Sequence, residues 1–459
     1  MANFTLQDGI DTITGTNGDD LFEGGTNGLQ TGDRIYGRDG IDELRSGVIG
    51  QANQAPLISR VENIFLDTAG LPFDISNVTG ARSIVSTNAS IILEPIEEDD
   101  LRITFGAENV ESGTVKLQFA DGALSGDEPS LRLSSTDSNV TFTSDSTFDS
   151  TNDGEENATL DALRIDRIDI QLNGTQNEID ISAFTEVQTL YLSGDAETKV
   201  VVDSTELSLI NASTANGGIT ITSDTATAQR VYTGDGNDDI KTGGGDDGVR
   251  SNGGDDVINL GGGNNTAAGG DGDDEIFAEA GDDRLLGEAG NDMIDAGSGN
   301  DIVRGGDGND MILAGGGEDR VFGGAGDDDI RGGGGADQLL DGVGNDIVRG
   351  GGGRDVFFAG LGTDEFIGGG GVDTFLFNQG TFDEDTVSDF TLTSNSETND
   401  LVVFELDGER QALSSQDSFE QFVDANPDAA SFDSNTDTIT IQADGGTITL
   451  EVSDADFLV

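Results

Sequence analysis

A period of nine residues runs without insertion or deletion from residue 233 to residue 376, which is 144 residues or 16 units. The stretches 269–277 (GGDGDDEIF) and 305–313 (GGDGNDMIL) show the pattern clearly. The fourth position is glycine in all 16 units, the sixth is aspartate in 15, and the eighth is Ile, Val, Leu or Phe in 15. Both departures, Asn265 and Ala267, fall in unit 260–268, which we expect to be a weak point. Such regularity predicts a solenoid whose units pack on their neighbours.

The residue types within one unit predict its local structure and chemistry. A single apolar residue at position eight, between polar residues, predicts a short strand with one inward side chain. The glycines before it permit a tight turn in which backbone carbonyl oxygens converge. The aspartate at position six adds a carboxylate, and an all-oxygen cluster of this kind favours a hard cation, with calcium the best fit. Two units make a coil of 18 residues, so aspartates 18 apart should stack and repel unless a cation lies between them.

The charge of the array agrees with this interpretation. Residues 233–376 contain 32 acidic and 8 basic residues, a net charge of −24. If each of the 16 turns pairs with the next turn on its own edge, about 14 sites form, and 14 divalent ions carry about +28. We therefore expect several Ca2+ ions, on the order of ten or more.

The array resembles the RTX family, whose motif is GGxGxDxUx and whose calcium-loaded repeats form a parallel β-roll. In that family the aspartate at position six and the carbonyl oxygens of the loop bind calcium. The resemblance therefore implies a metal-ligand role for the aspartates at position six of this chain. These are Asp238, Asp247, Asp256, Asp274, Asp283, Asp292, Asp301, Asp310, Asp319, Asp328, Asp337, Asp346, Asp355, Asp364 and Asp373.

Degraded copies of the same motif occur near the start of the chain. Four aspartates there are each followed two residues later by an apolar residue: Asp11, Asp20, Asp33 and Asp42. We predict a short RTX-like roll over residues 1–45, with these aspartates as candidate metal ligands. The alternative is a cap that binds no metal.

The remaining segments favour an all-β fold. We expect a β-solenoid over 46–232, because short strand patterns recur there and 74–84 (DISNVTGARSI) matches 180–190 (DISAFTEVQTL). Longer alternating strands predict an inserted β-sandwich-like module at about 91–159. The sixteen-unit roll spans 233–376, and a C-terminal cap and β-module spans 377–459. The fold class predicted is thus a parallel β-roll or β-solenoid with a β-sandwich-like insertion and a C-terminal β-module.

Composition excludes several classes of function. The chain has 90 acidic and 21 basic residues, a net charge of −69, and no His, Cys or Trp. It therefore lacks Ser-His-Asp and Cys-His triads and zinc sites built from His or Cys, and we expect no catalytic residues and no enzyme activity. The charge disfavours nucleic acid and anionic membranes as partners. No apolar run is long enough to span a membrane, and the first ten residues do not resemble a signal peptide.

The order of the parts resembles RTX-containing S-layer proteins of Gram-negative bacteria. The likeness rests on ITGTNGDDLFEGG near the start, SLINASTANGGITITS before the array and DTVSDF after it. The last six residues, DADFLV, resemble the uncleaved signal of type I secretion substrates. These resemblances imply an extracellular, cell-surface protein that folds in calcium and assembles with copies of itself into a sheet or fibre. They imply as further partner a cell-surface glycan or lipopolysaccharide. The alternatives are an RTX adhesin or matrix-binding module and an RTX-tailed polysaccharide-acting enzyme.

Overall fold

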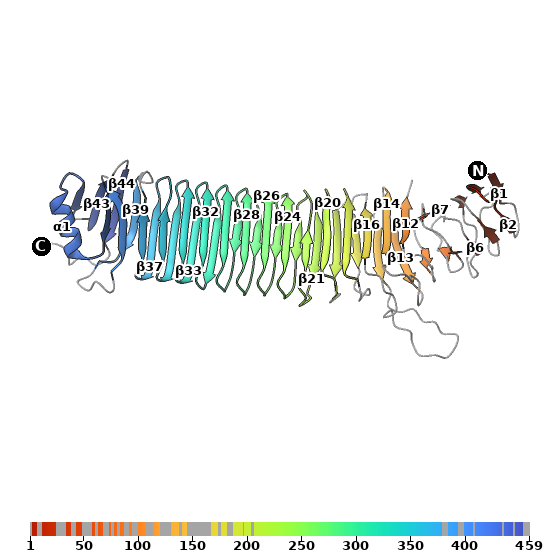
Figure 1. The fold of residues 1–459 in the computed structure, drawn as a ribbon, viewed down its shortest axis with the longest axis horizontal. Helices are drawn as coiled ribbons and strands as arrows, with labels where there is room; N and C mark the ends of the chain where they lie inside the picture. Colours follow the sequence, from red (N-terminus) through yellow and green to blue (C-terminus); the bar gives the residue numbers. More distant parts are fainter. Residues whose placement is uncertain are drawn as a thin grey trace, which may run out of the picture. The chain divides into compact units, whose positions relative to one another are not determined.

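Figure 1 shows the computed structural model of residues 1–459. It describes residues 206–378 continuously, followed by 384–392, 399–406, 409–433, 436–443 and 446–452. Before residue 206 it describes 2–6, 12–23, 34–37, 43–47 and a series of strands and short segments between 57 and 202. The chain divides into two compact units, Met1–Gly243 and Gly244–Val459, so the division falls inside the repeat array, in its second nonapeptide.

The second unit is a coil whose strands alternate between two parallel sheets (Figure 1). One sheet contains β24 (Gly248–Gly253), β26 (Thr266–Asp271), β28 (Arg284–Ala289), β30 (Ile302–Asp307), β32 (Arg320–Ala325), β34 (Gln338–Val343), β36 (Val356–Ala359) and β38 (Thr374–Phe377). The other contains β25 (Val257–Asn259), β27 (Glu275–Phe277), β29 (Met293–Asp295), β31 (Met311–Gly316), β33 (Asp329–Gly335), β35 (Ile347–Gly353), β37 (Glu365–Gly371) and β39 (Asp385–Phe390). Ile276 pairs with Ile294 and Ile294 with Ile312, which confirms the coil of 18 residues.

The eighth position of each repeat forms the core between the two sheets. Ile276, Ile294 and Val321 have no exposed surface. Towards the C-terminal end this position becomes aromatic, and the rings of Phe357 and Phe375 stack with centroids 4.6 Å apart. One inward side chain per short strand thus produces a continuous core, as the repeat predicts.

A C-terminal cap closes the roll by changing the strand direction. In one sheet β38 pairs in parallel with β40 (Leu401–Leu406), and β40 pairs antiparallel with β41 (Glu409–Leu413). In the other, β39 pairs in parallel with β44 (Gly446–Val452), which continues antiparallel through β43 (Thr438–Ala443) to β42 (Ala430–Asp433).

The helix α1 (Gln416–Ala425) belongs to this cap and was not predicted from the sequence. Its buried Phe419 and Phe422 contact the rings of Phe390 and Phe404, with centroids 5.8 and 5.4 Å apart. Ser415 caps its first turn. The predicted secretion signal at 454–459 lies outside the described residues.

The first unit is also built of parallel coils. One stack contains β16 (Arg167–Leu172), β18 (Thr189–Gly194), β20 (Leu209–Ala215) and β22 (Arg230–Tyr232). The other contains β17 (Gln176–Asp180), β19 (Glu197–Val202), β21 (Ile219–Ser223) and β23 (Asp239–Lys241). These coils are the β-solenoid that the sequence predicted before the roll.

The β-sandwich-like insertion predicted over 91–159 is not what the described strands form. β12 (Asp100–Gly106) pairs in parallel with β10 (Ser83–Ser86) and with β14 (Ser130–Thr136), which itself pairs with β16. In the other stack, β13 (Gly113–Phe119) pairs in parallel with β11 (Ile91–Leu93) and with β15 (Val140–Ser144). The segment therefore continues the solenoid. Alternating residues indicate a strand but not its partner, so the pattern is the same in both architectures.

The degraded N-terminal repeats also form parallel pairs. One stack joins β1 (Ala2–Thr5), β3 (Asp20–Glu23), β5 (Glu43–Gly47) and β7 (Asn63–Asp67). A second joins β2 (Thr12–Thr14), β4 (Arg34–Tyr36), β6 (Leu57–Ser59) and β9 (Val78–Thr79), while β8 (Phe73–Asp74) pairs with β11. Phe22, Ile35 and Leu44, the apolar residues of these repeats, are fully buried. No helix in the part of the chain that the structure describes has the length and apolarity needed to cross a membrane.

The glycine at position four permits a close approach of successive coils, and this can be tested. At Gly308, where φ is +136°, an added Cβ would lie 1.9 Å from the carbonyl oxygen of Gly290. At Gly316 an added Cβ meets nothing within 4 Å. We expect Gly308→Ala to cost about 2 kcal/mol or more of stability, and Gly316→Ala to change it by less than about 0.5 kcal/mol. Unfolding in saturating calcium, followed by circular dichroism, measures both; equal losses would contradict this account of the turn.

Candidate metal centre

The aspartates at position six lie in two rows, one along each edge of the roll. Each occupies a turn immediately before a strand; Asp274 precedes β27 and Asp283 precedes β28. In the second unit every one of them is at most 3% exposed. These buried residues are Asp247, Asp256, Asp274, Asp283, Asp292, Asp301, Asp310, Asp319, Asp328, Asp337, Asp346, Asp355, Asp364 and Asp373. The structure thus gathers the predicted ligands of the array into two continuous lines.

The oxygen Oδ1 of each carboxylate links one coil to the previous one. The backbone N–H of Asp274 donates to Oδ1 of Asp292, at 2.9 Å, and that of Asp292 donates to Oδ1 of Asp310, also at 2.9 Å. The same bond joins Asp283 to Asp301 on the other edge, at 2.7 Å. Oδ1 is therefore a structural acceptor that fixes the spacing of the coils.

The second oxygen, Oδ2, has a different environment. It is buried and makes no hydrogen bond to protein in the residues Asp274, Asp283, Asp292, Asp301, Asp310, Asp319, Asp328, Asp337, Asp346 and Asp355. A buried carboxylate oxygen without a donor is costly, by several kcal/mol for an isolated charge. A row of ten such atoms indicates that something other than a protein N–H or O–H satisfies them.

The glycine at position one leaves a small space beside each of these oxygens. An added Cβ at Gly287 would lie 2.0 Å from Oδ2 of Asp292 and 2.7 Å from the carbonyl oxygen of Gly305. At Gly305 the equivalent distances, to Asp310 and Gly323, are 2.1 and 2.7 Å. A carboxylate oxygen and a backbone carbonyl of the next coil therefore face the same space. An all-oxygen, negatively charged donor set of this kind fits calcium.

Burial raises the pKa of these carboxyl groups, and neighbouring aspartates of the same row add to the shift. Burial is the larger cause, and it acts against the lowering effect of the hydrogen bond to Oδ1. The pKa of Asp274, Asp310 and Asp355 rises to about 7, and that of Asp292 and Asp346 to about 6. Ionising the rows at neutral pH is therefore unfavourable unless a cation lies between the carboxylates.

The unit expected to be weak, 260–268, shows how a turn is completed by protein atoms alone. Oδ1 of Asn265 accepts from the N–H of Asp247, at 3.0 Å, so the row continues. Its Nδ2 donates to the carbonyl oxygens of Gly263 and Gly261, at 3.0 and 3.4 Å. An amide N–H thus satisfies turn carbonyls that would otherwise face a cation. Ala267 keeps the core position of the unit and is fully buried.

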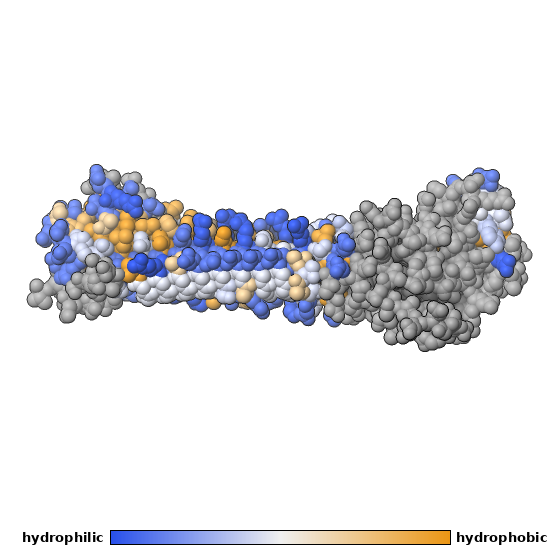
Figure 2. Space-filling model, turned by 60° about the horizontal axis from the view of Figure 1, so that its bottom comes forward, coloured by the Kyte–Doolittle hydropathy of each residue, from blue (hydrophilic) through white to orange (hydrophobic). Residues whose placement is uncertain are grey.

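A second, exposed row of hydrogen bonds was missed by sequence reasoning. It runs in the opposite direction through position five: the N–H of Asn291 donates to Oδ1 of Asp273, at 2.7 Å, and that of Asn300 to Oδ1 of Asp282, at 2.8 Å. The signal was present, because position five is Asn or Asp in most units. Figure 2 shows hydrophilic residues in continuous rows along the roll, beside paler rows.

Two aspartates beyond the array extend the buried rows and were also missed. The N–H of Asp364 donates to Oδ1 of Asp385, at 3.1 Å, and the N–H of Asp373 donates to Oδ1 of Asp400, at 2.8 Å. The separations are 21 and 27 residues, so a frame of nine could not reveal them. Oδ2 of Asp400 accepts from the N–H of Thr391, at 2.7 Å, so a protein donor ends that row.

The candidate ligands of the first unit differ from those of the array. Asp20 is fully buried, and both its carboxylate oxygens accept hydrogen bonds from Thr16, with Ala2 as a further donor. Burial acts against ionisation, but these hydrogen bonds prevail and hold the pKa of Asp20 below its usual range. Asp238 receives the N–H of Ile219 on Oδ1, at 2.7 Å. The remaining N-terminal candidates, Asp11, Asp33 and Asp42, lie outside the described residues.

Comparison with known families agrees with this geometry. The family described as the RTX calcium-binding nonapeptide repeat (4 copies) matches residues 232–267, 268–303, 304–339 and 341–375. These four matches cover the sixteen units almost completely. No curated protein matches the chain.

The raised pKa values predict how stability depends on pH when calcium is removed. A carboxyl whose pKa is about 7 in the folded chain and about 3.8 in the unfolded chain destabilises the fold above pH 7. The penalty shrinks as the pH falls towards 4. We expect the melting temperature in chelator to rise between pH 8 and pH 5, centred at pH 6–7. In saturating calcium the trend should weaken or reverse, because protons displace calcium. A rise centred near pH 4 would instead indicate exposed carboxylates.

Asn265→Asp tests the division of labour between the two oxygens. The variant keeps the acceptor Oδ1 and replaces the amide donor by a second carboxylate oxygen. We expect it to bind about one more calcium ion at saturation and to be less stable than the wild type in chelator. The matched control is Asn264→Asp, an exposed change in the same turn, which should alter neither quantity. Equilibrium dialysis with elemental analysis counts the ions; unchanged counts in both variants would refute the assignment of Oδ2.

Proposed function

Because its repeats place this chain in the RTX β-roll family, we propose that it is a secreted, calcium-dependent structural protein that assembles into a surface array. The observation that carries the calcium part is the row of buried Oδ2 atoms that have no protein donor and face turn carbonyls. The repetition of this arrangement in every second turn along each edge supports a count on the order of ten ions.

The charge of the chain supports a role for calcium as a folding trigger. At a net charge of −69 the unbound chain repels itself and stays expanded where calcium is scarce. Outside cells calcium is near millimolar, the range in which extracellular calcium modules bind. When the position-six carboxylates are neutralised there, the hydrophobic positions can pack, so the free energy of binding becomes free energy of folding.

A structural role is favoured over catalysis by what the chain offers chemically. Without His or Cys, nucleophilic and acid–base catalysis would depend on carboxylates, hydroxyls and a few basic groups. In the roll the buried carboxylates repeat at one spacing and serve the coil-to-coil bonds. A repeated surface is suited to contacts with further copies of the chain. Exposed Val343 and Leu361, which lie side by side on neighbouring coils, add a small apolar contact to that surface.

Electron microscopy with circular dichroism tests the proposal, using purified full-length protein titrated from chelator to about 10 mM calcium. We expect a gain of β-structure at about millimolar calcium, followed by ordered sheets or fibres. Magnesium at the same concentrations is the control and should be much less effective, because it requires a smaller, octahedral site. Folded but dispersed monomers would favour an adhesin or matrix-binding module over self-assembly. The absence of any structural response to calcium would overturn the proposal entirely.

A further inference from the structure

One unit of the roll carries an extra carboxylate at its turn. Asp341 occupies position one, where the other units have Gly, Ala, Ser, Thr or, once, Leu. It is 1% exposed. A buried acidic side chain at a position that is otherwise small or apolar requires an explanation, because burying a charge without a partner is strongly unfavourable.

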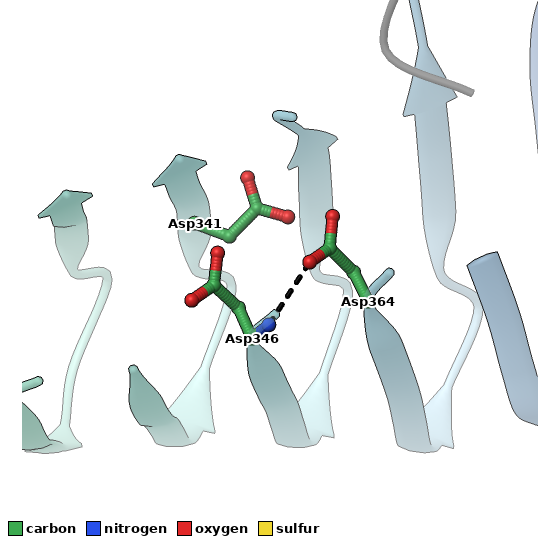
Figure 3. Close-up of side chains that lie close together, drawn as sticks. All are labelled: Asp341, Asp346 and Asp364. Atoms are coloured by element: carbon green, nitrogen blue, oxygen red, sulfur yellow. Dashed lines mark hydrogen bonds between the residues drawn. The ribbon is translucent and has the colours of Figure 1, made fainter. Parts of the chain in front are cut away.

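The geometry of the turn directs this side chain at the predicted metal ligands. In neighbouring units a Cβ added at position one would approach Oδ2 of the unit's own aspartate, at 2.1 Å for Gly305 and Asp310. Figure 3 shows the corresponding arrangement for Asp341, whose carboxylate lies beside those of Asp346 and Asp364. One oxygen of each of the three lies within 4.8 Å of the others. Among the described residues, this is the group of three that the metal-ligand criterion finds.

The three carboxylates are not neutralised by protein. Oδ1 of Asp341 accepts the N–H of its neighbour Gly342, at 2.6 Å, but its Oδ2 and that of Asp346 are buried and make no hydrogen bond. Arg349 of the same unit pairs with Asp329 instead, at 2.6 Å. Burial, and then the charge of Asp364, raises the pKa of Asp341 to about 8. Two unpartnered buried oxygens therefore face one small space.

We propose that Asp341, Asp346 and Asp364 form a three-carboxylate calcium site that binds its ion more tightly than the other turns of the roll. Elsewhere along an edge, two successive position-six carboxylates share a turn; here a third is added, and calcium affinity increases with the number of charged ligands. The inference rests on the proposed function, since it presumes that the roll binds calcium. Its consequence is that the turns joining residues 341–346 to residue 364 keep their ion when the rest of the roll is depleted.

Calcium-binding isotherms of the full chain in graded chelator buffers test the site. Asp341→Gly restores a residue common at position one, and Asp341→Asn keeps the size while removing the charge. The control is Asp271→Asn, an exposed change at position three of another unit. We expect the wild type and the control to hold one ion at about tenfold lower free calcium than the others require. Both Asp341 variants should lose that ion and keep the weaker class.

Three results would overturn the inference, and they have different meanings. A single affinity class in the wild type would show that the third carboxylate adds nothing. An Asp341→Asn variant that keeps the tight ion would show that Asp341 is a buried, protonated side chain rather than a ligand. Absence of calcium binding by the wild type would remove the proposed function as well. Circular dichroism in 10 mM calcium, about the millimolar range of such modules, verifies that each variant retains its β-structure.

Discussion

The stacking of like-charged carboxylates between successive coils is the constraint on which the roll depends. Parallel strands set neighbouring coils about 4.8 Å apart, and at that distance two buried carboxylates repel strongly. The chain resolves half of the problem internally, because Oδ1 of each aspartate receives a backbone N–H from the previous coil, as in the pair Asp274 and Asp292. The other half remains with Oδ2, and it makes the fold dependent on what lies beside that atom.

Hydrogen-bond donors and cations are alternative solutions for that second oxygen. At Asp20 and Asp400 the protein supplies a donor from Thr16 and Thr391. In unit 260–268 the side chain of Asn265 replaces the oxygen by an amide that bonds the turn carbonyls. Between these positions the structure provides oxygen atoms only. The alternation divides the molecule into parts that are complete as a polypeptide and parts whose stability is linked to calcium.

The limits of prediction follow from what each pattern encodes. The candidate rows were predictable, because a fixed spacing of 18 residues places the same atoms on the same edge. Asp385 and Asp400 were not, because the chain between coils lengthens there and the spatial register continues without the sequence register. The helix α1 is short and lies outside any repeat. The strands at 100–144 alternate as a sandwich strand would, and their parallel partners became evident only in the fold.

The sequence by itself determined the coil length, the inward position eight, the family and the preference for a hard cation. These follow from local periodicity and residue chemistry, which do not depend on distant contacts. Only the tertiary structure decided which oxygen of each aspartate is structural and which is left for a cation, because this depends on donors one coil away. It also decided that Asp341 joins Asp346 and Asp364, since a side chain's partners across coils are fixed by packing and not by its position in the repeat.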